Sequence, residues 1–209
     1  MTTVLWARHG ENVANLSRTL SYRVFDGDLT PAGRRQAREL ADYLAAPSAE
    51  PVGRIVCSPL RRARQTADAV AERLGLPVTA ELEDLRELNV GDLDGRSDAR
   101  AWQIYFAVIE AWRAGQLDAR FPGGEDCTEL RRRLLRALLA VAGKKPAGEG
   151  QTLIVAHGGA LRAAVPLLTG GPDPGTDLAT GSVATLRVLP EGAIPPLRLL
   201  SWPESATNP

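Results

Sequence analysis

The sequence is short of several residue types, and each shortage narrows the class of protein. It has only two cysteines, Cys57 and Cys127, and no C-x-x-C motif or Cys/His cluster, so it indicates neither a disulfide framework nor a zinc site. So few cysteines favour a reducing compartment. Lys+Arg and Asp+Glu balance at 25 each, which leaves no excess positive charge to attract a nucleic acid. The composition therefore favours a small-molecule partner.

Long apolar segments are also missing. Residues 1–8 lack a basic stretch followed by an apolar run of signal-peptide length. The most apolar helix-like run, residues 134–142, contains Arg136 and is far shorter than a membrane span. We therefore expect a cytoplasmic protein that does not contact a membrane.

The chain is long enough to fold around a single core. Short β-branched apolar stretches alternate with helical patterns over its 209 residues, which is typical of an α/β protein with a largely parallel sheet. The sequence predicts one domain over residues 1–202, a three-layer sandwich in which helices cover both faces of a mostly parallel central sheet. Residues 203–209 are predicted to be a disordered tail. The predicted strands are 3–7, 54–57, 77–80, 152–156, 183–188 and 197–202.

Helix signals fill the gaps between these strands. Thr30 is placed to cap a helix that has Pro31 in its first turn. Ser58 and Pro59 repeat the pattern before a helix that Gly75 is predicted to end. Two further helices are predicted over residues 97–113 and 125–142.

The only two histidines, His9 and His157, have matching surroundings. Each follows a predicted apolar strand and precedes a glycine. The carboxyl ends of parallel strands line the ligand crevice of such a sheet, and the helix that follows presents free N–H groups to an anion. We therefore expect both imidazoles to face one anion site, while two unrelated histidines in turns remain the alternative.

Charged candidates accompany the histidines. Arg62 precedes Ala63, which belongs to the predicted buried stripe, so Arg62 is expected nearer the crevice than the solvated Arg61 and Arg64. Glu87 lies just ahead of the turn-rich segment 91–95.

Taken in chain order, these residues resemble the histidine phosphatase superfamily, the phosphoglycerate mutase-like clan. The likeness covers about residues 3–190. Relatives often have an asparagine where this sequence has Thr180 or Gly181. The matching motifs are Arg8-His9-Gly10-Glu11 with Asn15, Leu29-Thr30 with Gly33, Ser58-Pro59-Leu60 with Arg62-Ala63, Leu85-Arg86-Glu87, Pro122-Gly123-Gly124-Glu125 and Val155-Ala156-His157-Gly158-Gly159.

The resemblance implies a phosphatase that works without a metal ion or a cofactor. In this interpretation His9 takes the phosphoryl group from a monoester and water then removes it. Arg8, Arg62 and a protonated His157 stabilise the charge on the phosphoryl oxygens.

The resemblance also implies a single proton donor and acceptor. Glu87 protonates the leaving group and later takes a proton from water. Glu11 is the alternative for this role, although its place after Gly10 is also explained by the dipole of a helix start. Asn15 and Gly158 complete the predicted phosphate-binding set.

The branch of the family is less sharply defined. Residues 91–95, Gly-Asp-Leu-Asp-Gly, are similar to the compact form that this segment has in phosphatase relatives. The favoured interpretation is therefore a phosphatase that acts on a small phosphomonoester. Phosphoglycerate mutase-type transfer and non-catalytic binding of a phosphorylated ligand are the alternatives. Neither a nucleic acid nor a membrane is an expected partner, and a homodimer is left open.

Two features bear on the substrate. The segment 102–121 carries aromatic residues that either pack in the core, the favoured interpretation, or roof the pocket. They are Trp102, Tyr105, Phe106 and Trp112. Alternatively, Arg18, Arg23 and Arg162 recognise a second acidic group.

Overall fold

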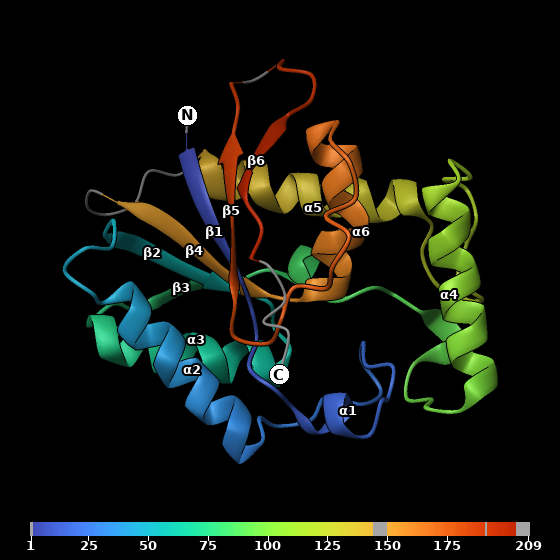
Figure 1. Cartoon of the computed structure of the whole chain (residues 1–209), viewed down its shortest axis with the longest axis horizontal. Helices are drawn as coiled ribbons and strands as arrows, with labels where there is room; N and C mark the ends of the chain where they lie inside the picture. Colours follow the sequence, from blue (N-terminus) through green and yellow to red (C-terminus); the bar gives the residue numbers. More distant parts are fainter. Residues whose placement is uncertain (1, 144–149, 191, 204–209) are drawn as a thin grey trace.

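A six-stranded sheet forms the centre of the molecule (Figure 1). The structure is a computed structural model that describes residues 2–143, 150–190 and 192–203. The strands lie in the order β3-β2-β4-β1-β5-β6. Pairing is parallel from β3 through β1, and β5 and β6 are antiparallel, so the predicted mostly parallel sheet is confirmed. The bounds are β1 (Thr2–Arg8), β2 (Val52–Cys57), β3 (Val78–Glu81), β4 (Gln151–Ala156), β5 (Val183–Val188) and β6 (Leu197–Ser201).

Helices cover both faces of the sheet, as predicted. Successive side chains of a strand point to opposite faces, so Leu153 and Val155 of β4 join one buried cluster and Ile154 joins the other. The first cluster contains residues of α2 (Pro31–Leu44) and α3 (Arg61–Leu74), and the second contains residues of α5 (Cys127–Ala142) and α6 (Gly158–Thr169) (Figure 1). The three-layer sandwich is thereby confirmed.

Helix α4 (Ala99–Arg113) stands to the side of this sandwich (Figure 1). Asp98 caps it by accepting from the Ala101 N–H at 3.1 Å. The indole of Trp102 donates to the carbonyl of Arg18 at 2.8 Å, which ties α4 to the segment that follows the short α1 (Val13–Leu16). Side chains rather than sheet pairing therefore hold α4 in place.

The predicted caps have different outcomes. Thr30 caps α2 by accepting from Gly33 N–H at 3.0 Å, and Gly75 ends α3 with a φ of 66°. Ser58 does not cap α3, because that helix begins at Arg61 with Leu60 as its N-cap. The Ser58 hydroxyl is buried and contacts the ring of His157 instead.

Part of the prediction falls outside the described residues. Only Pro203 of the predicted tail is described, and residues 144–149 of a predicted loop are not. Within the described ranges, no helix combines the length and the hydrophobicity needed to span a membrane.

Candidate active site

His9 lies where β1 ends and is almost completely buried. Its Nδ1 lies 2.7 Å from the carbonyl oxygen of Gly10. A carbonyl can only accept, so Nδ1 carries the proton and the electron pair lies on Nε2. Burial, reinforced by the guanidinium groups of Arg62 and Arg8, holds the pKa of His9 well below its ordinary value. The imidazole is therefore neutral at pH 7 and nucleophilic at Nε2.

His157 lies beside it, and the two ring centroids are 5.2 Å apart. The Nε2 of His157 lies 2.8 Å from the Ser58 hydroxyl, which accepts from Leu60 N–H at 3.3 Å. Ser58 can thus donate to Nε2, which leaves the proton on Nδ1. Burial and then Arg62 lower the pKa of His157 well below its ordinary value, so the ring differs from the cation expected from the sequence. A neutral His157 can still donate a hydrogen bond through Nδ1.

Arg62 supplies a buried positive charge in the first turn of α3. Its Nε–H donates to His9 Nε2 at 3.1 Å. The two remaining nitrogens donate to the hydroxyl and the carbonyl of Ser21, each at 3.0 Å. Burial lowers the pKa of Arg62 to about 10, which still leaves it charged at pH 7. The guanidinium is thus fixed next to the nucleophilic nitrogen.

Two glycines make room for the other charged groups. A Cβ atom on Gly158 would lie 2.9 Å from Cδ of Arg8, and one on Gly159 would lie 3.0 Å from Oε1 of Glu87. Arg8 donates to the carbonyl of Leu178 at 2.6 Å. The two glycines at the start of α6 therefore let a cation and a carboxylate approach the same helix end.

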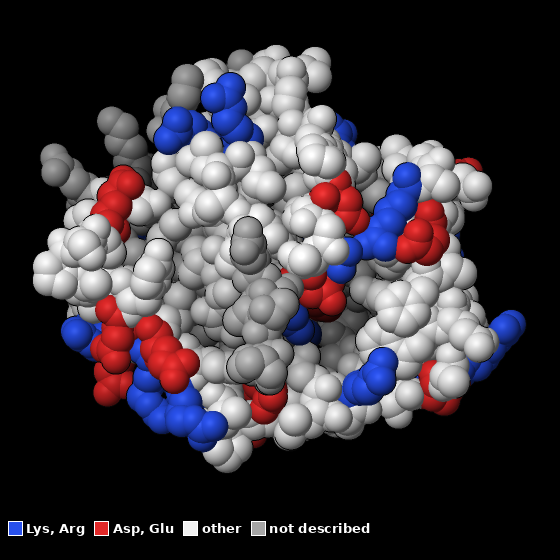
Figure 2. Space-filling view, viewed as in Figure 1, with Lys and Arg blue, Asp and Glu red and all other residues white. Residues whose placement is uncertain are grey.

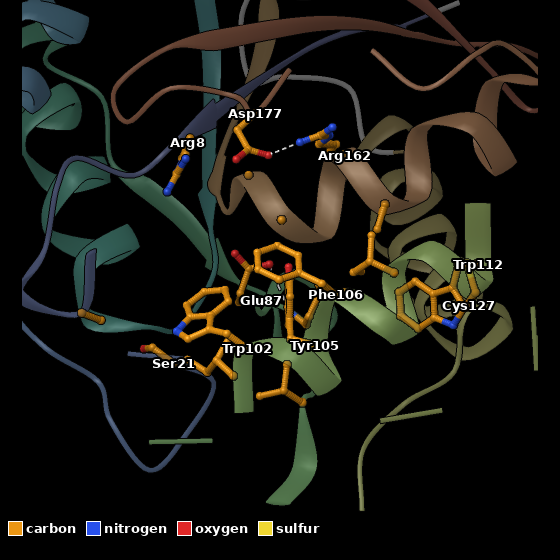
Figure 3. Close-up of a pocket in the computed structure, with 18 of the residues that line it drawn as sticks. Arg8, Ser21, Glu87, Trp102, Tyr105, Phe106, Trp112, Cys127, Arg162 and Asp177 are labelled. Atoms are coloured by element: carbon orange, nitrogen blue, oxygen red, sulfur yellow. Dashed lines mark hydrogen bonds and ion pairs between the residues drawn. The ribbon is translucent and has the colours of Figure 1, made fainter. Parts of the chain in front are cut away.

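Glu87 is held by one carboxylate oxygen. Its Oε1 accepts from the N–H groups of Leu88 at 3.0 Å and Ala160 at 2.6 Å. Among the described residues, no hydrogen bond reaches Oε2. The side chain lines the cavity, so Oε2 is the oxygen available for proton transfer (Figure 3).

Three buried polar atoms around this site have no partner within the described structure. They are Nε of Arg8, Nδ2 of Asn12 and Nδ1 of His157. A buried polar group without a hydrogen bond is costly, and such atoms are uncommon in folded proteins. Each is a nitrogen whose N–H an anionic ligand could satisfy.

Comparison with known proteins agrees with this geometry. The family model for the histidine phosphatase superfamily (branch 1) matches residues 4–193. The chain belongs to the histidine phosphatase superfamily. It is 35% identical to the uncharacterized phosphatase PhoE of Bacillus subtilis over 83% of this chain and 80% of that protein.

Other members of the superfamily are similar over most of the chain. The probable phosphoglycerate mutase GpmB of Yersinia enterocolitica is 36% identical, over 82% of this chain and 77% of its own. The solved structure titled mycobacterial hydrolase 1 superposes with a TM-score of 0.76 at 28% identity, covering 99% of this chain and 100% of the other. The relatives thus include proteins named as hydrolases and as mutases.

Asn12 lies in this site although it was not among the predicted site residues. It lines the cavity, and it is also the N-cap of α1 through its Oδ1. The predicted Asn15 lines the cavity too, but its Oδ1 accepts from Asn12 N–H at 3.0 Å. The Asn-x-x-Asn spacing of residues 12–15 is the sequence signal that could have indicated Asn12. In a reciprocal capping box each side-chain oxygen accepts from a backbone N–H, which leaves both amide nitrogens for a ligand.

Several other predicted residues lie elsewhere. Arg61 and Arg64 are exposed, as expected. Glu11 does not line the cavity but accepts from the Thr30 hydroxyl at 2.7 Å, so the structure does not support it as the acid. Arg23 pairs with Glu83 at 3.8 Å and lies outside the cavity lining.

The position where relatives often have asparagine has a backbone role here. Gly181 has a φ of 78°, and its N–H lies 3.1 Å from the carbonyl of Arg8 and 3.2 Å from that of His9. It therefore supports the segment that carries the nucleophile.

The aromatic segment contributes to both core and cavity. Trp102, Tyr105 and Phe106 line the cavity, and Figure 3 shows them extending from α4 toward it. Phe121 is completely buried, and Trp112 is buried against it while also reaching the cavity wall. The favoured expectation of a core stripe is therefore right for Phe121 and Trp112. Trp102 and Tyr105 pack against the core and also line the cavity, and Phe106 is half exposed at the cavity wall.

Within the described parts of the chain, no group of three or more His, Cys, Asp or Glu side chains is placed to hold a metal ion.

Proposed function

We propose that the protein is a metal-independent phosphomonoester hydrolase that acts on a small phosphorylated metabolite through a phosphohistidine on His9. The observation that carries this proposal is the group of buried polar atoms without partners on Arg8, Asn12 and His157. The His157 ring lies 5.2 Å from that of His9, and Arg8 and Asn12 line the same cavity as His9 and Arg62. This combination suits the binding and transfer of a phosphoryl group.

In the first half-reaction, Nε2 of His9 attacks phosphorus and the bond from phosphorus to the ester oxygen breaks. Arg62 Nε–H donates to this nitrogen at 3.1 Å, so that hydrogen bond must pass to a phosphoryl oxygen before Nε2 attacks. The equatorial oxygens gain charge in the transition state, where Arg8 and Arg62 stabilise them. Glu87, protonated at Oε2, gives its proton to the departing alkoxide.

In the second half-reaction, water attacks the phosphohistidine. Glu87, now ionised, accepts a proton from the water as the bond to Nε2 breaks. Inorganic phosphate forms and His9 leaves as a neutral ring. Water has a route to the site because the cavity is open to the surface, which Figure 2 shows hollowed between α4 and the rest of the molecule.

We expect purified protein to release phosphate from p-nitrophenyl phosphate with or without EDTA, because no step needs a metal ion. His9→Ala should abolish turnover and the acid-labile, base-stable phosphoenzyme. Glu87→Gln should slow turnover while phosphate binding persists, since the amide keeps the size of the carboxylate but cannot exchange protons. Phosphate release and phosphoenzyme labelling measure these effects.

The same assay with 3-phosphoglycerate as a second substrate separates the alternatives. A mutase would exchange the phosphoryl group between positions of a sugar acid with little phosphate release. A protein that only binds phosphorylated ligands would show neither reaction. Loss of activity with EDTA and its recovery with added metal, or a phosphoryl adduct that persists in His9→Ala, would contradict the mechanism.

A further inference from the structure

The cavity is much larger than a phosphoryl group requires. Its volume is about 860 Å³, which lies within the range of pockets that hold drug-sized ligands. Arg8, His9 and Arg62 line it together with residues of α4 and α6, and Figure 3 shows Arg8 on the opposite side of the lining from Trp112. The part of the cavity beyond Arg8, His9 and Arg62 is the space that the alcohol portion of an ester would fill.

The α4 wall of that space is apolar. Residues 102, 105, 106 and 109 follow the i, i+3, i+4, i+7 spacing of one helix face, and all four line the cavity. The rings of Trp102, Tyr105 and Phe106 contact one another, with centroids 5.2 to 5.6 Å apart. Phe106 remains 52% exposed. This face is apolar, preorganised and partly exposed to solvent. Covering it with an apolar group of the ligand would therefore stabilise the complex.

The opposite wall adds further apolar surface. Pro166 and Leu167 of α6 line the same space, as does Leu88, which follows Glu87. An apolar group that leaves the phosphoryl end therefore has the α4 rings on one side and aliphatic side chains on the other.

Two arginines that line the α4 and α6 side of the cavity, Arg113 and Arg162, already pair with carboxylates. Arg162 pairs with Asp177 and, at 3.3 Å, with Asp173 (Figure 3). Arg113 lies 2.9 Å from the other oxygen of Asp173 and also pairs with Glu110. A second anionic group on the substrate would have to compete with these carboxylates.

Apart from Arg8 at the phosphoryl end, Arg18 is the one cavity-lining cation that has no ion pair among the described residues. Its side chain is exposed, so solvent screens its attraction for a carboxylate. The wall therefore favours an uncharged group.

We infer that the substrate is a phosphomonoester whose alcohol portion is uncharged and apolar, a ring or an alkyl chain held between α4 and α6. This inference rests on the proposed phosphatase function and specifies its substrate class. The reaction that supplies such a substrate is one that phosphorylates an apolar alcohol.

The test uses ethyl, butyl and hexyl phosphate together with 3-phosphoglycerate. The alcohols of the alkyl series have nearly the same acidity, so their chemical reactivity is matched and only the apolar surface grows. We expect kcat/KM to rise about two- to fourfold per added methylene. The doubly charged sugar acid should be turned over less efficiently than hexyl phosphate.

Two variants test whether the dependence on chain length arises at the α4 wall. Phe106→Ala should lower the ratio of kcat/KM for hexyl over ethyl phosphate several-fold. Tyr43→Ala, which removes a 67% exposed ring on α2, is the matched control and should keep the wild-type ratio. An unchanged ratio in Phe106→Ala would overturn the assignment to α4.

Failure of the inference is distinguishable from failure of the phosphatase proposal. Phosphate release that does not depend on chain length, or a preference for 3-phosphoglycerate, would overturn the inference and leave the phosphatase intact. No release from any ester, p-nitrophenyl phosphate included, would overturn both.

Discussion

The two histidines have matching settings in the sequence, but their hydrogen bonds give them different tasks. The Gly10 carbonyl fixes the proton of His9 on Nδ1 and leaves the electron pair on Nε2, which accepts from Arg62 Nε–H. The Ser58 hydroxyl occupies Nε2 of His157, which leaves its Nδ1–H as a donor. One ring is thereby suited to attack phosphorus and the other to bind a phosphoryl oxygen, although both have lowered pKa values.

The donor role of His157 predicts a loss of transition-state stabilisation when the ring is removed. His157→Ala should reduce kcat by about a hundredfold or more, as does the loss of one oxyanion donor in other enzymes. Vanadate resembles the five-coordinate transition state, so its inhibition constant should rise more than that of phosphate. Steady-state kinetics and vanadate inhibition measure both effects.

Ser58→Ala is the milder companion variant, because it retains the ring and removes only the partner of Nε2. It should lose less activity than His157→Ala. A fully active His157→Ala protein that binds vanadate as tightly as the wild type would show that the two rings do not share one site.

At the scale of elements, periodicity was enough to predict the sheet and four of its helices. Each strand was located to within two residues at either end, because apolar runs and turn residues mark strand limits locally. The role of Ser58 could not be predicted in this way. Its hydroxyl has two competing uses, capping α3 or contacting His157, and 99 residues separate it from His157.

The placement of Glu87 also depends on contacts that the sequence does not reveal. Arg133 on α5 donates to the carbonyls of Asp84 and Arg86 at 2.8 Å and of Glu87 at 2.9 Å. Its charge is paired with Glu125, whose Oε1 also accepts from Asn89 N–H at 2.8 Å. The pair holds both ends of the loop that carries the proposed acid.

Removing the guanidinium should therefore affect both stability and catalysis. The Arg133 and Glu125 side chains are 12% and 6% exposed, so Arg133→Met leaves a nearly buried carboxylate unpaired. We expect a loss of about 3–5 kcal/mol in the free energy of unfolding. Release of the loop should lower kcat more than it changes KM. Urea unfolding and steady-state kinetics measure the two effects.

Arg132→Met is the matched control, because Arg132 is the exposed neighbour on α5. It should stay within about 0.5 kcal/mol of the wild type. Arg133→Lys keeps the charge but not the planar fork, so it should recover only part of kcat. If Arg133→Met kept the wild-type kcat under conditions where it is folded, Arg133 would not position Glu87.

At the scale of the whole molecule, charge is balanced in number and mixed in space. Figure 2 shows Lys and Arg interspersed with Asp and Glu over the visible face, and the sequence carries equal numbers of each sign. Inside the molecule, Arg62 lies beside two histidines with lowered pKa values, and the Asp26 carboxylate is 3.6 Å from its Nη1. Folding therefore buries the ionisable groups of the site. The free energy of unfolding consequently depends on the protonation of the two histidine rings.

This link predicts that the protein becomes less stable as pH falls below about 6.5. The pKa values of His9 and His157 are lowered in the folded state, whereas an unfolded histidine titrates near 6.5. Below that pH the unfolded chain binds more protons than the folded one, so the free energy of unfolding decreases with acidification. The slope approaches about 1.4 kcal/mol per pH unit for each histidine well below pH 6.5, and the expected loss between pH 6.5 and 5.5 is about 1 kcal/mol for each.

Urea unfolding at pH 7.5, 6.5 and 5.5 measures this slope. The chain has no other histidine. Carboxylates with lowered pKa values, such as Asp98 at about 2 and Glu83, lose their contribution only near and below pH 4, outside this window. A His9→Gln/His157→Gln double variant should therefore show little pH dependence between 6.5 and 5.5. Equal stability of the wild type at these two pH values would mean that the rings are charged, or free to become charged, in the folded protein.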